Sequence, residues 1–406
     1  MGREEAITVI VVERERLVSF GAGLAEELAG LGYTPNCIAR HLRLLRRLDE
    51  WMAGEGLTPG ELTAADVERF VGTRRGAGQS RWPSQRGVAP LLGYLRGAGV
   101  VPMPLAPVAA TSVERVAASY RRWLVEERSL AASTVENYER YVCRFFSQLA
   151  EPVREDLSRL SVADVTAAVR VQCRSRSVGW VKNFNTVLRS LLRFLFLEGY
   201  VGRDLSPSVL SVAGWRRSGL PKALDPKDVA RLLASCARQR RAGRRDLAIL
   251  TLVVRLGLRA GEVVALELGD IDWPVGEIVV RGKGGRLDRL PLPTDVGEAI
   301  VNYLRHERPP TTSRRVFILA VAPRTGISTK TVAGVVRCAC ERACVAPVSP
   351  HRLRHTAATA MLRGGASLAD VGQVLRHQRA ETTSIYAKVD IGLLATLAMP
   401  WPQVSA

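Results

Sequence analysis

The chain has 406 residues, of which 47% are hydrophobic and 24% charged, a balance typical of a globular protein with several domains. Its 58 lysines and arginines outnumber its 39 acids, and the formal charge of +19 favours a polyanion such as nucleic acid as partner. No uninterrupted apolar run reaches the ~18 residues of a membrane span, and the first residues lack the features of a secretory signal. We therefore expect a cytoplasmic protein without a membrane partner.

The first hundred residues are predicted to form a bundle of helices. In residues 36–52 the apolar side chains recur every three or four positions, while arginines occupy the other faces. A second helix should follow residues 62–67, and a third should span residues 88–97. Residues 101–107 contain three prolines, so this segment cannot continue a helix and is predicted to be a linker.

A second helical region follows the linker and resembles the first. We predict a helix capped by Ser133 and Thr134, another that opens at residues 160–165, and a long one over residues 181–198. Leu-Thr-Ala-Ala-Asp-Val at residues 62–67 returns 98 residues later as Leu-Ser-Val-Ala-Asp-Val, and Arg46 matches Arg144 at the same offset. Chance similarity between two bundles rich in leucine and arginine is the alternative, but the shared order of elements favours duplication.

The character of the sequence changes after a second predicted linker at residues 206–224. Asp225 is followed by Pro226 and is predicted to cap a helix. Helices are predicted at residues 245–256 and 260–266. Three short strands should follow at residues 271–273, 277–281 and 287–292, with turns at 274–276 and 282–285. Helices are expected over most of the rest.

Three cysteines cluster as Cys338, Cys340 and Cys344, which raises the question of a zinc site. A fourth ligand at the usual spacing is missing, and the segment also has the pattern of an amphipathic helix. Buried thiols with a structural role are the preferred interpretation. The sequence predicts neither a metal site nor a cofactor.

Four pieces of the C-terminal region carry residues suited to phosphate chemistry. Cleavage of a phosphodiester without a metal needs fixed cations for the charge that develops on phosphorus-bound oxygens, a proton for the leaving oxygen and a nucleophile. Arg259 and Arg354 offer paired guanidinium forks, and His351 and His377 offer hydrogen bonds. Lys283, at a glycine-rich turn, offers the proton, and Tyr386 offers the attacking oxygen. Each of these residues taken alone has an ordinary structural explanation, such as a solvated helix face or a packed aromatic ring.

Together these residues resemble the signature of the tyrosine recombinase (phage integrase) family of site-specific DNA recombinases. The match consists of Gly257-Leu258-Arg259-x-x-Glu262, Lys283, His351-x-x-Arg354, His377 and Tyr386, in this order. His351 and His377 precede Tyr386 by 35 and nine residues, which is the usual spacing in that family. The C-terminal segment, residues 393–402, is similar to that of long integrases found with transposable elements, and its leucines could dock on a neighbouring subunit or fold back in cis.

The resemblance implies an enzyme that cleaves and rejoins duplex DNA through a 3′-phosphotyrosine, without metal or ATP. Arg259, His351, Arg354 and His377 would hold the scissile phosphate. Lys283 would protonate the leaving 5′ oxygen, and Tyr386 would attack the phosphorus. Glu262, one helical turn after Arg259, and His355 would orient these side chains without touching the phosphate, although a solvent-facing His355 is an alternative. Arg376 departs from the pattern, because many members have glycine directly before the histidine that His377 matches.

The resemblance also implies the architecture, which is mainly α-helical with a small antiparallel β-sheet. Residues 225–406 would form a mixed α/β catalytic domain, and residues 111–206 a helical core-binding domain of the SAM-like type. Residues 1–100 would form an extra N-terminal helical domain, for which the repeat suggests a further role in DNA binding. The implied partners are double-stranded DNA and further copies of the chain, as a tetramer on paired sites; other recombinases of the same element are candidate partners.

Two other functions fit the same residues. A type IB topoisomerase shares this chemistry but relaxes supercoils as a monomer without exchanging strands between sites. A non-catalytic DNA-binding protein on the same fold would be expected to have lost a catalytic residue, and this sequence has lost none.

Overall fold

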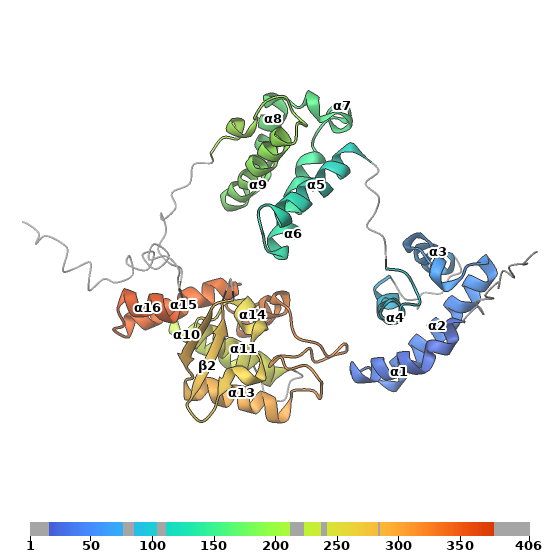
Figure 1. Cartoon of the computed structure of the whole chain (residues 1–406). Coiled ribbons are helices and arrows are strands. Elements are labelled where there is room, and N and C mark those ends of the chain that lie inside the picture. Colours follow the sequence, from blue (N-terminus) through green and yellow to red (C-terminus); the bar gives the residue numbers. More distant parts are fainter. Residues whose placement is uncertain are drawn as a thin grey trace, which may run out of the picture. The chain divides into compact units, whose positions relative to one another are not determined.

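The computed structural model describes residues 16–75, 85–103, 111–211, 223–236, 242–282 and 285–376 (Figure 1). The chain divides into two compact units, one of residues 104–216 and the other of residues 1–103 with 217–406. Three stretches are described in turn below: the N-terminal bundle (described residues 16–103), the second bundle (described residues 111–211) and the C-terminal part (described residues 223–376). In these stretches no helix is both long enough and apolar enough to cross a membrane.

The N-terminal bundle is built from amphipathic helices around a core of leucine. Thr34 caps the long helix by accepting a hydrogen bond from the Cys37 amide, and Gly56 ends it in the left-handed conformation (φ 71°). The buried side chains of residues 17–101 form one hydrophobic cluster. In chain order, the elements are η1 (Leu17–Phe20), α1 (Gly21–Gly30), α2 (Pro35–Glu55), η2 (Pro59–Glu61), α3 (Ala64–Arg75) and α4 (Gln85–Gly97).

The second bundle follows the same plan with more aromatic side chains in its core. Its buried residues, from Val113 to Val209, form a second hydrophobic cluster. Ser161 and Asp164 cap the helix they open, with the Asp164 carboxylate 2.9 Å from the Ser161 amide nitrogen. The elements are α5 (Ser112–Glu126), α6 (Ala132–Phe146), α7 (Glu151–Glu155), η3 (Leu157–Arg159), α8 (Val162–Ser175), α9 (Val178–Leu197) and η4 (Ser206–Ser208).

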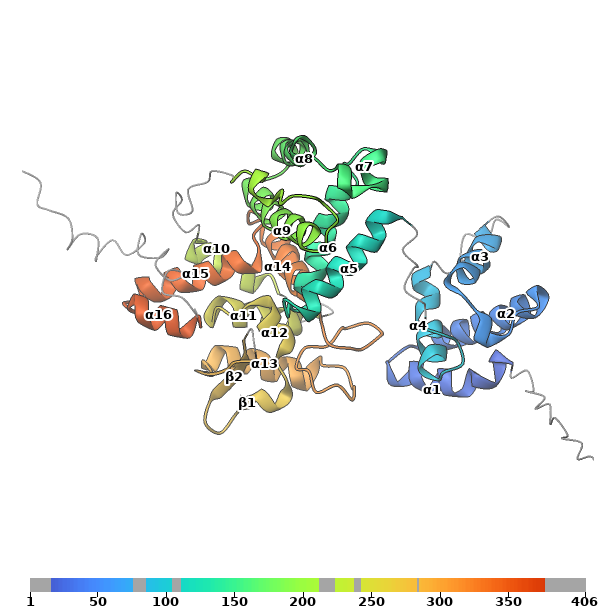
Figure 2. The ribbon, with the colours of Figure 1, turned by 45° about the horizontal axis from the view of Figure 1, so that its top comes forward.

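The C-terminal part combines helices with a three-stranded antiparallel sheet. The sheet order is β1-β2-β3, with Ile271 paired to Ile278 and Arg281 paired to Leu287. Helix α11 is central, because it contacts α13, α14 and α15 and its buried residues join the main cluster (Figure 2). The elements are α10 (Pro226–Ala234), α11 (Gly243–Arg255), α12 (Ala260–Ala265), η5 (Leu268–Asp270), β1 (Ile271–Asp272), β2 (Glu277–Arg281), β3 (Leu287–Pro291), α13 (Thr294–His306), α14 (Thr329–Ala343), α15 (Pro350–Arg363) and α16 (Leu368–Val374).

The predicted fold class is confirmed: helices dominate, and the three strands lie where the sequence placed them, each within one residue. Asp225 caps α10 as predicted, because its carboxylate accepts a hydrogen bond of 2.8 Å from the Lys227 amide. The division into domains at 1–100, 111–206 and 225–406 stays a prediction.

Two local predictions were wrong. Helix α6 is not capped by Ser133 or Thr134, because it begins at Ala132 and its N-cap is Ala131, which has no side-chain acceptor. The cysteines of α14 are not uniformly buried. Cys340 is buried, whereas Cys344 is exposed and ends the helix in the left-handed conformation (φ 50°).

The packing of α9 predicts a contrast between two of its leucines. Leu191 is 0% exposed in the core and Leu197 is 63% exposed. We expect Leu191→Ala to lower the free energy of unfolding by about 2–5 kcal/mol, because it removes buried methyl groups and leaves a cavity. Leu197→Ala should change it by less than about 0.5 kcal/mol. Urea denaturation followed by circular dichroism measures both, and equal losses would contradict this packing.

Candidate active site

A sharp turn after α11 positions the first site residue. Gly257 has φ +60°, and a Cβ on it would lie 2.5 Å from the end of the Leu375 side chain, so a larger residue would strain the backbone and displace Leu375. The chain then enters α12 with Arg259 as N-cap, and Glu262 lies in the first turn of that helix. The Glu262 carboxylate accepts hydrogen bonds from the backbone amide of Arg259 at 2.8 Å and from its guanidinium at 2.7 Å. This double contact fixes Arg259 at the start of the helix.

Helix α15 contributes three predicted residues on one face. Ser349 caps the helix by accepting a hydrogen bond from the Arg352 amide, and Pro350 occupies the first turn. His351, Arg354 and His355 follow at a spacing of three and four residues, which places them on the same side. The helical spacing therefore places the three side chains close together.

Arg354 connects the two segments from within the protein. Its side chain is only 3% exposed. Its two terminal nitrogens donate hydrogen bonds to the backbone carbonyl oxygens of Gly257 and Leu375. Its Nη1 also lies 3.9 Å from the Glu262 carboxylate. Arg354 thus joins α15 to the turn before α12 and to the end of α16.

Arg376, which departs from the family pattern, is a buried residue that contacts Glu262. Its backbone has φ +55°, the left-handed region that glycine favours. Its guanidinium is buried and donates to the Glu262 carboxylate at 2.6 Å and to the Val374 carbonyl oxygen at 2.8 Å. The only signal in the sequence was an arginine at a position where glycine is common.

Glu262 is therefore shared by Arg259, Arg354 and Arg376. Its carboxylate is 4% exposed. Burial raises the pKa of Glu262, but the Arg376 charge and the hydrogen bonds from Arg259 and Arg376 outweigh it and hold the pKa below its usual value. Three guanidinium groups share one carboxylate, which leaves two positive charges in excess among these four side chains.

The two histidines of α15 form a pair. Their Nε2 atoms are 3.0 Å apart, so one ring donates a hydrogen bond and the other accepts it. Burial, with the charges of Arg354 and Arg259, lowers the pKa of His351. Burial, with His351 and Arg354, lowers the pKa of His355 to about 4. Both imidazoles are thus neutral near pH 7, and they offer hydrogen bonds without adding charge to the cluster.

The structure brings together Arg259, Glu262, His351, Arg354 and His355. His355 contacts His351, so the alternative of a purely solvent-facing residue is not what the structure shows. Lys283, His377, Tyr386 and the predicted docking segment 393–402 lie outside the described residues. Within the described part of the chain, no group of three or more His, Cys, Asp or Glu side chains could hold a metal ion.

The chain is similar to known proteins over most of its length. The model of the phage integrase family matches residues 222–391. A putative integrase/recombinase of Sinorhizobium fredii, y4rA, is 37% identical over 382 residues, which cover 93% of each chain. Tyrosine recombinase XerD of Mycobacterium leprae is 31% identical over 294 residues, which cover 68% of this chain and 92% of XerD. A crystal structure of a lambda integrase tetramer bound to a Holliday junction shares the fold, with a TM-score of 0.55 at 14% identity, over 86% of this chain and 92% of that one.

The chain therefore belongs to the tyrosine recombinase family of site-specific recombinases. The family predicted from the motifs is confirmed.

The buried pair of Arg376 and Glu262 predicts a large effect on stability. We expect Arg376→Met to lower the free energy of unfolding by about 1.5–3 kcal/mol, because it removes a charged hydrogen bond to Glu262, which keeps Arg259 and Arg354 as partners. Arg363→Met, on the exposed part of α15, is the matched control and should have little effect. Thermal and urea denaturation measure both variants. A melting curve of Arg376→Met that coincides with that of Arg363→Met would contradict the pairing.

His355 predicts a dependence of stability on pH. Its pKa is lower in the folded protein than in the unfolded chain, where a histidine titrates near about 6.5. The unfolded chain therefore binds more protons between those values, so stability should fall as the pH drops from about 6.5 towards 4. His355→Gln should lose less stability over this interval than the wild type. Identical pH profiles for wild type and His355→Gln would refute the assignment.

Proposed function

We propose that this chain cleaves and rejoins duplex DNA at specific sites through a covalent 3′-phosphotyrosine, with Tyr386 as nucleophile. The observation that carries the proposal is the excess of positive charge at the cluster, where Arg259, Arg354 and Arg376 share the single carboxylate of Glu262. Arg354 and Arg376 are buried and Arg259 is half-exposed, so an anion that reaches Arg259 would meet a positive field that one carboxylate does not cancel. A phosphodiester is a suitable anion, because guanidinium forks match the geometry of phosphate oxygens.

The chemistry needs no external energy source. The Tyr386 hydroxyl would pass its proton to a neutral base such as His351, and its oxygen would form a bond to phosphorus while the bond from phosphorus to the 5′ oxygen breaks. The Lys283 ammonium would give that 5′ oxygen its proton. One phosphodiester is exchanged for another, so the reverse reaction can rejoin the strand without ATP. Arg259, Arg354, His351 and His377 would stabilise the charge that builds up on the non-bridging oxygens.

The exposure of the described residues supports different roles for the proposed phosphate-binding side chains. Arg259 has a side chain that is 46% exposed, so it can reach a ligand from solvent, whereas Arg354 is almost fully buried. His351 is exposed and neutral, which suits a hydrogen-bond partner of a phosphate oxygen or of the phenol. Glu262 and His355 would not touch the phosphate. Glu262 would position Arg259 and His355 would position His351, each through the hydrogen bonds described above.

Duplex DNA and further copies of the chain are the proposed partners. The charge of +19 supports DNA, and the lambda integrase structure bound to a Holliday junction is a tetramer. We include in this proposal a catalytic domain over residues 225–406, a core-binding domain over 111–206, and assembly of four copies on two paired sites. Separate hydrophobic clusters in the three stretches of the chain support the division. Other recombinases of the same element are candidate partners.

Removal of a single oxygen atom tests the nucleophile. We expect Tyr386→Phe to bind DNA as the wild type does but to form no covalent adduct, because phenylalanine has no attacking oxygen. DNA from the source cells, which carries the natural target site, is incubated with the protein and digested with nucleases. Tyrosine-linked nucleotides are then detected by mass spectrometry.

Tyr138→Phe in α6 is the matched control, since it removes the same atom elsewhere and should leave the adducts unchanged. Adducts at the wild-type level in Tyr386→Phe would eliminate Tyr386 as nucleophile. Supercoil relaxation by the wild type without exchange between two sites would instead favour the topoisomerase.

A further inference from the structure

The two helical bundles bury the same positions, helix by helix. The buried residues of η1 and α1 reappear in α5 at an offset of 96 residues, as Leu17, Leu24 and Leu28 against Val113, Tyr120 and Leu124. The buried residues of α2 reappear in α6 at an offset of 97, as Leu44, Leu45, Leu48, Asp49 and Met52 against Tyr141, Val142, Phe145, Phe146 and Leu149. A shared burial pattern means that each helix turns the corresponding face towards its core.

The second half of each bundle continues the match. Helices α3 and α8 share an offset of 98, with Leu62, Val67, Phe70 and Val71 against Leu160, Val165, Ala168 and Val169. Helices α4 and α9 share an offset of 100, with Val88, Leu91, Leu92 and Leu95 against Leu188, Leu191, Leu192 and Leu195. The offset only grows along the chain, as expected if the two copies differ by short insertions in their loops.

The two bundles also share helix caps, short 3₁₀ helices and a left-handed glycine, none of which follows from burial alone. Asp66 and Asp164 both accept a hydrogen bond of 2.9 Å from the amide of the residue three positions earlier, Thr63 and Ser161. The 3₁₀ helices η2 and η3 both precede these caps. Gly99 and Gly199 both adopt φ above +70° after the last helix, where the carbonyl oxygens of Leu95 and Leu195 each accept two amides. Such shared local features favour duplication over chance similarity.

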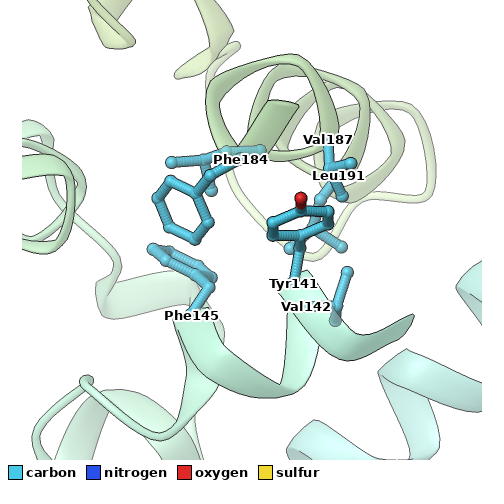
Figure 3. A pocket seen from close by; sticks show the side chains of 7 residues that line it. Tyr141, Val142, Phe145, Phe184, Val187 and Leu191 are labelled. Carbon is cyan, nitrogen blue, oxygen red and sulfur yellow. The ribbon is translucent and has the colours of Figure 1, made fainter. Parts of the chain in front are cut away.

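The core contact of the second bundle has a partial counterpart in the first. In the second bundle, Tyr141, Val142 and Phe145 of α6 face Phe184, Val187 and Leu191 of α9 (Figure 3). The offsets given above place Leu44, Leu45 and Leu48 of α2 at the positions of the α6 side chains, and Leu91 of α4 at that of Leu191. All four belong to the N-terminal hydrophobic cluster. Val187 corresponds to Gly87, so this part of the contact is not repeated, and Leu44 and Leu48 stand where the second bundle has aromatic rings.

The outer face of α2 is strongly basic. From Pro35 to Leu48 the helix contains four arginines and no acid. Arg40, Arg43 and Arg46 are exposed, and none of the three forms an ion pair with a described residue. At the offset of 97, Arg43 and Arg47 correspond to Arg140 and Arg144, which are exposed on α6. The basic positions are thus partly repeated along with the core.

We propose that the N-terminal bundle is a second copy of the second bundle and binds duplex DNA through the arginine face of α2, defined as Arg40, Arg43 and Arg46. This inference rests on the proposed function, since the DNA-binding role of the second bundle is part of it. Six residues of helix extend about 9 Å, so the three guanidinium groups can follow the backbone of one DNA strand. Duplex DNA is the occupant that the charge favours, because each phosphate contact releases counterions. The chain then holds DNA at two modules besides the active site.

The test measures how the affinity for DNA depends on salt, with the full-length chain and a fluorescent 60-base-pair duplex of mixed sequence. The test variant is Arg40→Gln/Arg43→Gln/Arg46→Gln. The matched control is Ala22→Glu/Ala29→Glu/Ala53→Glu, which lowers the net charge by the same amount at exposed positions outside the arginine face. Circular dichroism confirms that both variants are folded.

We expect the slope of log K against log salt concentration to fall by about two to three for the arginine variant, because each lost phosphate contact contributes about 0.9 to the slope. The glutamate control should weaken binding at low salt and keep the slope within about one of the wild-type value. Equal slopes for the wild type and the arginine variant would overturn the proposal. So would equal slopes for the two variants, which would show a charge effect without a specific face.

The same preparations separate this inference from the proposed function. Tyrosine-linked nucleotides formed by the wild type support the recombinase chemistry whatever the slopes show. If the wild type forms these adducts and the arginine variant keeps the wild-type slope, the arginine face is refuted and the chemistry stands. If the wild type forms no adducts but the slope of the arginine variant is smaller than that of the wild type, the chemistry is refuted and the DNA-binding face stands.

Discussion

The carboxylate of Glu262 organises the candidate active site. It accepts hydrogen bonds from Arg259, at the start of its own helix, and from Arg376, which lies 114 residues further along the chain. Without a carboxylate between them, the guanidinium groups of buried Arg354 and Arg376 and half-exposed Arg259 would repel one another. One acid attracts all three but does not neutralise them, so it fixes their positions and leaves a net positive charge.

Arg376 shows how a departure from a family pattern can be accommodated. A left-handed backbone costs a residue with a side chain about 1–2 kcal/mol, and this cost explains why glycine is common at such a position. Here the arginine adopts φ +55° and pairs with Glu262, and this buried pair offsets the cost. His377, which we propose to bind the scissile phosphate, is the next residue in the sequence.

Local patterns in the sequence predicted much of the fold. Contacts between segments that are distant in the sequence could not be predicted from these patterns. The strands, the Asp225 cap and the face shared by His351, Arg354 and His355 depend on residues within one or two turns of one another. The pairing of Arg376 with Glu262 depends on how α12 and α16 meet, which no local pattern contains. The predicted cap at Ser133 and Thr134 was wrong. The helix begins at Ala132, two residues before the start that a Ser133 cap would give and three before that of a Thr134 cap, so both hydroxyls lie inside its first turn.

The register of the internal repeat could not be predicted from sequence identity alone. Sequence identity matched Arg46 to Arg144 at an offset of 98, whereas burial aligns α2 with α6 at 97 and pairs Arg47 with Arg144 instead. An arginine tolerates several positions on an exposed face, but a core position must be filled. Burial is therefore the better guide to the register of a diverged repeat.

The proposed mechanism requires Arg259, His351 and Arg354 to surround the scissile phosphate with Tyr386 in line for attack. The most direct measurement is a structure of the full chain on its mapped cleavage site, with vanadate in place of the scissile phosphate. We expect vanadium with the Tyr386 oxygen at one apex and the 5′ oxygen at the other, and with donors of all three residues about 3 Å from its equatorial oxygens. Vanadate bound away from these side chains, or with another residue at the apex, would contradict the proposed mechanism.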